Sequence, residues 1–402
     1  MEKIDREQFY NRLFLYPSDF HYLQAVARAV GLSEDQLWRL YSLMGAQELA
    51  NTLPLAKYHN FSYDPSQPMD FRFNLHCHSN HSDGQFTVTE WLEQGRVLAD
   101  ERSAITDNLP AFTIALTDHD CIAGCEEIVK TLIKNPQKYQ NLRIVLGAEL
   151  GAVWKDESCQ RVPLEYELIW YSLNPFDKKI TDFLSVHHFQ RVNVAKEIVK
   201  KLSSRFPQAG LSYHEACQVQ PLLFKNQGLG FYNRIYTYAV SKIQDESQNS
   251  EIYDICRTFN NPFEVKEKFN PYQNTDDIFH LMRSSGFGFI GIAHPQKINT
   301  AKFIKPEFEQ QCYAENKNPA YELVYKWLNM LRSKGLKAMD INYQFNNDDL
   351  IRAQNMILNK EIIDNNFPAY HWLKLFVDYA DKYGILSAGG YDSHGKNLRA
   401  RH

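Results

Sequence analysis

FRFNLHCHSNHSDG (Phe71–Gly84) begins as an apolar strand and ends in a dense group of polar side chains. His76 and His78 are two residues apart, so on a strand their side chains point to the same side, while Cys77 between them points to the other. Two histidines at this spacing can chelate one metal ion. Asp83 stands beside a glycine in a predicted turn, from which its carboxylate can fold back toward the pair. The stretch therefore predicts a strand that carries metal ligands at its carboxyl end.

Short apolar runs of the same kind recur along the rest of the chain. Segments with helical spacing lie between most of them, and strands that alternate with helices indicate parallel strands joined by crossovers. Seven strands are many for one open sheet and suit a barrel, which typically takes about 250 residues as one domain. The seven predicted strands are residues 71–75, 112–116, 143–147, 166–171, 288–293, 337–342 and 384–389. We therefore expect an α/β fold with a barrel of parallel strands.

Polar side chains stand at the ends of most of these strands. They are His76 and His78, Asp118 and His119, Glu149, Glu165 and Glu167 at the start of the fourth strand, His294, and Asp392 with His394. In a parallel barrel such residues converge on the C-terminal face, where active sites lie. Any one pair alone is often a hydrogen-bonded structural pair, but chance would rarely place such residues at most strand ends. Imidazoles and carboxylates together predict a site for divalent metals.

The chain divides into an N-terminal part and a longer main domain. Residues 1–66 show helical spacing and a capping box at Ser33, which predict an α-helical extension. This extension either packs on the main domain or binds a protein partner. The main domain spans residues 70–402, and its stretch from about 176 to 285 is mostly helical. Because a connection of that length must form its own subdomain, we predict a helical insertion that caps one end of the barrel.

Composition limits the classes of partner and the cellular location. The net charge of −4 is nearly balanced and has no long basic or acidic run, so it gives no case for nucleic acid or an anionic membrane as a partner. The sequence contains no apolar stretch typical of a signal peptide or a membrane span. Its seven cysteines are scattered without CxxC pairs, and we interpret them as reduced thiols. We expect a cytoplasmic protein.

Five segments, in this order, resemble the motifs of the PHP family (polymerase and histidinol phosphatase). They are HCHSNHSDG, ALTDHDCIAG, GAEL, IAHP and GGYDSHG, and the resemblance runs from about residue 71 to 395 with the insertion fitting loosely. The TDHD motif and a helical insertion before AHP are similar to those of the small-molecule phosphatases of this family, including nucleotide phosphatases. The resemblance implies a distorted (β/α)7 TIM-like barrel that binds two or three divalent ions of Mn, Zn, Fe or Mg.

The same resemblance implies a set of ligands for these ions. One ion would be held by His76, His78, Glu149 and Asp392, and a second ion by Asp83, His119 and His394. A third ion would be held by Glu149, His294 and a residue of the fourth strand. The family commonly has a histidine at the start of that strand, where this chain has EYELIWY. We predict that Glu167 replaces it and that Glu165 is the less favoured choice. The alternative is a site for two metals.

The insertion also departs from the family. Nucleotide-phosphatase relatives often carry an Arg-Pro-His tripeptide there, with the arginine suited to a phosphate, whereas this chain has GFYNRIYTYAV. Arg234 in this stretch and Lys297 just past AHP are the candidate contacts for a phosphate. Besides their implied role as ligands, His119 and His394 are candidate proton donors to a leaving group. His81 is at a variable position of the first motif and is expected at the surface.

These residues favour metal-dependent hydrolysis of a phosphoester in a small metabolite or nucleotide. A serine or cysteine nucleophile is not indicated, since the chain has neither GxSxG nor a cysteine in a phosphate-binding loop. Two alternatives stay open. An amidohydrolase-type barrel also begins with HxH and ends with an aspartate. A partly degenerate metal site would instead suit a non-catalytic protein that binds a phosphorylated ligand or acts as a scaffold.

Overall fold

The computed structural model describes the main part of the chain from residue 73 onward, with gaps. The described ranges are 73–103, 112–134, 136–139, 142–219, 232–258, 272–285, 288–295, 298, 303–340, 375–376, 378–380, 382–388 and 392–394. The predicted N-terminal extension, with its contact surface for a partner, and Lys297 lie outside these ranges.

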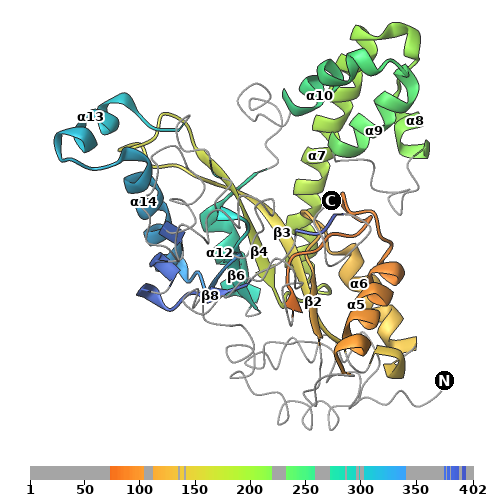
Figure 1. Cartoon of the computed structure of the whole chain (residues 1–402), viewed down its shortest axis with the longest axis horizontal. Helices are drawn as coiled ribbons and strands as arrows, with labels where there is room; N and C mark the ends of the chain where they lie inside the picture. Colours follow the sequence, from red (N-terminus) through yellow and green to blue (C-terminus); the bar gives the residue numbers. More distant parts are fainter. Residues whose placement is uncertain are drawn as a thin grey trace.

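Eight strands form one curled sheet at the centre of the molecule (Figure 1). They are β1 (Phe73–Asn74), β2 (Phe112–Leu116), β3 (Leu142–Trp154), β4 (Leu164–Tyr171), β5 (Gln273–Asn274), β6 (Phe289–Ile292), β7 (Ala338–Met339) and β8 (Leu386–Ser387). Their order is β1-β2-β3-β4-β6-β7-β8, and β5 pairs with β3. Each of the seven predicted segments overlaps one of these strands, so their positions are confirmed, although β3 continues seven residues beyond its predicted end. The eighth strand, β5, consists of two polar residues, Gln273 and Asn274, so no apolar run marked it in the sequence.

The prediction that all strands run parallel is wrong for β4. This strand pairs antiparallel with both β3 and β6, whereas the other neighbours along the main strand order are parallel. Only residues 155–163 connect β3 to β4, and a connection this short without a helix suits antiparallel neighbours, because a parallel pair needs a crossover of about a dozen residues or more. The start of β4 therefore lies beside the end of β3, where Glu167 pairs with Gly151.

The two edges of this strand order meet at the first motif. Among the described residues β8 does not pair with β1, so a closed barrel is not described. The chain just after β8 returns to β1, however, and Ser393 forms a parallel bridge with Cys77. The N–H of His78 donates to the carbonyl of Ser393 at 3.0 Å, and the N–H of Ser393 donates to the carbonyl of His76 at 3.1 Å. These bonds bring the last motif of the sequence against the first.

Helices flank the sheet on both sides. On one side lie α5 (Val88–Ser103) and α6 (Ala123–Lys134), and on the other side lie α12 (Thr275–Ser285), α13 (Pro306–Ala314) and α14 (Pro319–Lys334) (Figure 1). Large apolar side chains fill the space between helices and sheet, and Trp91, Trp170 and Trp327 are almost completely buried there. Since burial of each such side chain removes about 150–250 Å² from water, this core holds the strands that carry the polar residues.

The predicted helical insertion contains α7 (Lys178–Arg205), α8 (Tyr213–Val219), α9 (Tyr232–Ile243) and α10 (Asn249–Thr258). These four helices share an apolar cluster of their own, and α7 extends from the sheet up to it (Figure 1). The first turns of α7 pack in the main core through Ile180 and Leu184. The last helix of the predicted segment, α12, also packs in the main core, through Ile278 and Phe279. The division into domains stays a prediction.

Two expectations from composition can be compared with the structure. All seven cysteines are free thiols, and six of them are buried. In the part of the chain that is described, no helix is long and apolar enough to cross a membrane. The cytoplasmic location stays a prediction.

Candidate metal centre

Hydrogen bonds hold the loop that carries the first predicted ligands. Asp118 accepts hydrogen bonds from the backbone N–H and the hydroxyl of Ser79, at 2.7 and 2.6 Å. Gly84 closes the loop, since its N–H donates to the carbonyl of Ser79 at 3.0 Å. A Cβ at Gly84 would lie 2.2 Å from the carbonyl oxygen of His78, so no larger residue fits there. Because the chain turns back at this point, Asp83 returns to the side of the histidines.

The first group of potential ligands consists of His76, His78, Glu149 and Asp392, all buried. Nε2 of His76 lies 3.1 Å from Oε2 of Glu149 and 3.4 Å from Oδ1 of Asp392. Nε2 of His78 lies 3.2 and 3.3 Å from the same two oxygens. Atoms that bind a tetrahedral ion at about 2.1 Å lie about 3.4 Å from one another. The spacing of these four atoms therefore matches that of a metal site.

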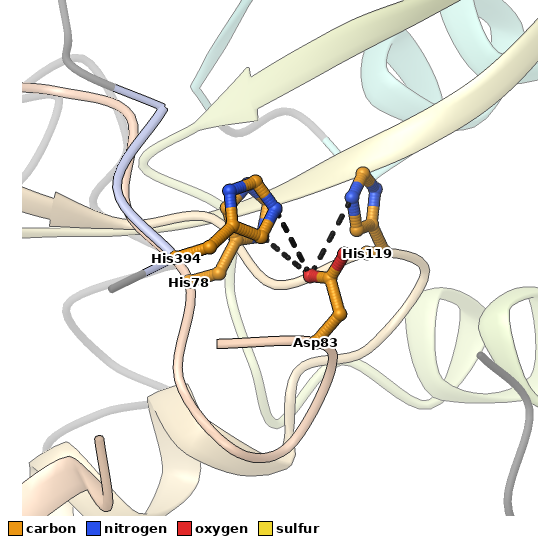
Figure 2. A group of neighbouring side chains, drawn as sticks. All are labelled: His78, Asp83, His119 and His394. Carbon is orange, nitrogen blue, oxygen red and sulfur yellow. Dashed lines mark ion pairs between the residues drawn. The ribbon is translucent and has the colours of Figure 1, made fainter. Parts of the chain in front are cut away.

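A second group surrounds the carboxylate of Asp83 (Figure 2). Its Oδ1 lies 3.1 Å from Nε2 of His394, 3.7 Å from Nε2 of His119 and 3.8 Å from Nδ1 of His78. His78 turns its Nε2 to the first group, and an imidazole that binds one ion through Nε2 is expected to leave Nδ1 for a hydrogen bond. Asp83, His119 and His394 then remain for a second ion.

A third group lies toward the start of β4. Nδ1 of His119 is 3.2 Å from Oε2 of Glu149 and 3.7 Å from Oε1 of Glu167. Nε2 of His294 lies 3.2 Å from Oε1 of Glu149 and 3.2 Å from Oε2 of Glu167. The side chain of Glu167 is 25% exposed, whereas that of Glu149 is fully buried, so Glu167 is the potential ligand most open to solvent. The antiparallel direction of β4 is what brings Glu167 to this end of the sheet.

The structure thus brings all nine predicted ligands into one cluster. They are His76, His78, Asp83, His119, Glu149, Glu167, His294, Asp392 and His394. Several buried atoms of the cluster face only other potential ligand atoms and form no well-aligned hydrogen bond, among them Nε2 of His78, Oδ1 of Asp83 and Oε1 of Glu149, whose nearest such neighbours lie 3.1–3.2 Å away. Buried polar atoms are normally hydrogen-bonded with good geometry, so this arrangement points to a further bonding partner. A cation that these atoms share would satisfy them, and the donor set therefore fits metal ions.

The charges of the cluster lead to the same conclusion. Burial alone would lower the pKa of His78, but the carboxylates of Asp392 and Glu149 outweigh it and raise that pKa to about 10. Burial alone would raise the pKa of Glu149, but the imidazoles of His76 and His119 hold it well below its usual range. Without a cation, protons on the imidazoles therefore balance the buried carboxylates. Divalent ions can replace these protons, because metal ligands must be deprotonated to bind.

Asp340 belongs to this centre, and our sequence analysis missed it. Its Oδ2 lies 2.9 Å from Nδ1 of His76, and both side chains are fully buried. Burial raises the pKa of Asp340, and the contact with His76 opposes that rise. A carboxylate on the second nitrogen of a ligand imidazole fixes the orientation of the ring. The signal was present in the sequence, since Asp340 is a carboxylate within the sixth predicted strand, residues 337–342, and it directly follows the observed strand β7.

Two ligand residues have strained backbones. His294 and Asp392 have φ angles of 26° and 49°, in a region that side-chain-bearing residues rarely adopt. Such conformations cost about 1–3 kcal/mol each and persist only where the surrounding structure enforces them. The strain is consistent with side chains that are aimed at a common point.

The other predicted site residues fall in different places. Arg234, on α9, donates a hydrogen bond to the carbonyl of Gly84, and burial lowers its pKa. Its neighbour Asn233 donates to Oδ2 of Asp83 at 3.4 Å, so the start of α9 contacts the ligand loop directly. Glu165 belongs to none of the three ligand groups that the described residues form.

The expectation that His81 lies at the surface is wrong. Its exposed fraction is 7%, and its Nε2 lies 2.9 Å from Oε2 of Glu127 on α6. The packing of α6 beside the loop covers this side chain, which the sequence of the motif alone does not reveal. His81 lies outside the three ligand groups.

Glu167→Gln is expected to remove one ion per chain, whereas Glu165→Gln will leave the metal content unchanged. The amide lacks the charge that holds a divalent ion, and among these two positions only Glu167 lies with His119 and Glu149. Metal per protein is measured by mass spectrometry of the elements after equilibration with Mn²⁺. Equal metal contents in the two variants would rule out Glu167 as a ligand.

Comparisons with known proteins add little to this geometry. No family model and no curated protein matches the sequence. Among solved structures, the chain resembles a protein from Bifidobacterium adolescentis that was proposed to be a metal-dependent phosphoesterase. The two sequences are 18% identical, the TM-score is 0.48, and the match covers 82% of this chain and 90% of that one. It also resembles an amidohydrolase from Chromobacterium violaceum with bound sulfate and no metal, with 15% identity, a TM-score of 0.49 and coverage of 83% and 90%. At these values neither likeness assigns a family or an activity.

Proposed function

We propose that this protein is a metal-dependent phosphoesterase that hydrolyses a small phosphorylated metabolite or nucleotide at a centre of two or three divalent ions. The observation that carries the proposal is the sharing of ligands between the three groups. The carboxylate of Glu149 lies in the first and third groups, with Oε2 toward His76 and Oε1 toward His294, while His78 and His119 each adjoin two groups. Shared ligands would place the ions side by side. Neighbouring divalent ions suit displacement at phosphorus, since they stabilise both the attacking and the leaving oxygen.

Each part of the cluster has a role in this reaction. When bound, the ions supply a more acidic water and neutralise phosphate charge. His76, held by Asp340, fixes one side of the centre, and Glu149 holds the middle. His119 and His394 are 12% and 17% exposed, which leaves their rings accessible from the solvent side where a leaving group would depart. We propose them as proton donors to that group in addition to their role as ligands.

Arg234 is the proposed contact for the phosphate. Its guanidinium lies beside the ligand loop at Gly84, and its planar donors match phosphate oxygens. The motifs shared with PHP phosphatases support a phosphoester rather than an amide as substrate, and they support a distorted (β/α)7 barrel as the complete fold. Lys297 keeps its proposed role as a second phosphate contact. The ions are drawn from Mn, Zn, Fe and Mg, because sets of histidines and carboxylates accept each of these.

The test is a substrate panel with the full-length protein loaded with Mn²⁺. Nucleoside monophosphates, sugar phosphates and p-nitrophenyl phosphate are assayed for released phosphate, and cyclic amides and lactones are assayed in parallel. We expect turnover of at least one phosphoester. An Asp392→Asn variant purified in the same way serves as the control, because loss of turnover in this variant excludes a contaminating phosphatase. Turnover of cyclic amides alone would identify an amidohydrolase. Tight binding of phosphorylated ligands without any turnover would identify a non-catalytic binding protein.

A further inference from the structure

Asp120 follows a ligand directly in the sequence, yet its side chain points to the helical insertion. It is almost completely buried and has a φ of 46°, which is unusual for a residue other than glycine. Its backbone N–H donates to the carbonyl of Glu149 at 2.7 Å. Its Oδ1 accepts a hydrogen bond from the N–H of Gly151 at 3.2 Å. The left-handed backbone is the conformation in which both bonds form.

These bonds link Asp120 to the backbone that carries His119, Glu149 and Glu167 of the third ligand group. His119 precedes it in the chain, and Glu149 is bonded to its backbone. Gly151, which donates to its carboxylate, is the residue paired with Glu167 across β3 and β4. A displacement of the Asp120 side chain would therefore move the backbone that carries all three ligands.

A charged residue of the insertion holds this carboxylate in place. Arg191, on α7, donates through Nε and Nη2 to Oδ2 of Asp120, with both atoms at 2.5 Å. The guanidinium is 13% exposed and the carboxylate 1%. Burial would lower the pKa of Arg191, but Asp120, together with Glu167 and Tyr272, raises it. The arginine is therefore charged and faces two carboxylates of the centre.

The location of this pair is informative because a buried ion pair contributes little net stability. The cost of removing two charges from water is about as large as their attraction, so an apolar pair of equal volume would serve the fold as well. The pair does what an apolar pair could not, since it joins α7 by directional bonds to the residue that links His119, Glu149 and Glu167.

We propose that Arg191 and Asp120 form a positioning pair, through which helix α7 of the insertion sets the geometry of the His119–Glu149–Glu167 ligand group. Neither residue touches the ions or the substrate in this role. The inference rests on the proposed metal centre but not on the proposed substrate. Loss of either partner will lower metal affinity most strongly at this group.

The test measures metal binding by metal-free full-length protein. Mn²⁺ is titrated by calorimetry, and the absorption spectrum of the Co²⁺ form reports ligand geometry. Asp120→Asn keeps the size and the left-handed preference of the residue but removes its charge, and Arg191→Gln removes the partner. We expect each variant to bind its weakest ion about 10–100-fold less tightly and to show an altered Co²⁺ spectrum, as is usual for residues that orient ligands. The double variant is expected to lose no more metal affinity than whichever single variant binds the metal less tightly.

Arg205 is the matched control, because it lies on the same helix and pairs through Nε with Glu251 at 2.5 Å on the surface. Arg205→Gln is expected to leave affinity and spectrum unchanged. An Arg191→Gln variant with wild-type metal affinity would overturn the proposal. A double variant whose fold-loss of metal affinity equals the product of the two single losses would overturn it as well. If Arg191→Gln does not fold, Arg191→Lys decides in the same way, with weakened binding supporting the pair and wild-type binding refuting it. Wild-type protein that binds no metal would instead refute the proposed function itself.

Discussion

Removal of divalent metal with a chelator is expected to abolish phosphoester hydrolysis and to lower the melting temperature by several degrees. The buried carboxylates of Glu149 and Asp392 then have only protonated imidazoles to balance them. An ion present at about 100 times its dissociation constant stabilises the folded state by about 2.7 kcal/mol, and that contribution disappears on its removal. The phosphate-release rate and a thermal melt by circular dichroism measure the two effects. Because the ligands must be deprotonated, metal release is also expected to be easier at low pH.

The control for this experiment is restoration of the ions. Addition of Mn²⁺, Zn²⁺, Fe²⁺ or Mg²⁺ in turn to the stripped protein is expected to recover both rate and melting temperature, and the order of recovery identifies the preferred metal. A chelated and dialysed protein that hydrolyses phosphoesters at the original rate would show that the ions are not required.

Glu149→Gln is expected to reduce the hydrolysis rate by at least about 10³-fold. Its two oxygens face the first and third ligand groups, at 3.1 Å from His76 and 3.2 Å from His294. An amide offers one acceptor oxygen and no charge, so it cannot serve two ions at once. Metal ions contribute several kcal/mol to the stabilisation of the transition state, and a loss of about 4 kcal/mol corresponds to about 10³ in rate. The rate at saturating substrate and Mn²⁺ is the measurement.

Glu127→Gln provides the comparison for this loss. Glu127 also pairs with a histidine of the first motif, His81, at 2.9 Å, but neither belongs to a ligand group. We expect this variant to hydrolyse at the wild-type rate. If Glu149→Gln retained more than about a tenth of that rate, less than 1.4 kcal/mol would separate it from the wild type, and a central bridging role would be excluded.

Much of the site could be predicted from the sequence because its signals are local. A strand needs only a short apolar run, and all seven predicted strands are present. Most of the candidate ligands stand at or near the ends of the predicted strands, so they could be proposed from the sequence, while their division into ligand sets followed from the resemblance to the PHP motifs. Asp340 carried the same signal and could have been found. The choice of Glu167 over Glu165 also agrees with the ligand groups that the structure forms.

The tertiary structure alone decided the rest. The direction of β4 depends on how strands pair, and a periodic pattern is the same for both directions. His81 is buried because α6 packs against its loop. Asp120 and Arg191 are 71 residues apart, and each is unremarkable in its own segment. Residue type and local spacing determined which side chains can bind metal. Which of them meet, and which helix holds them, depends on contacts between distant segments that form only when the chain packs.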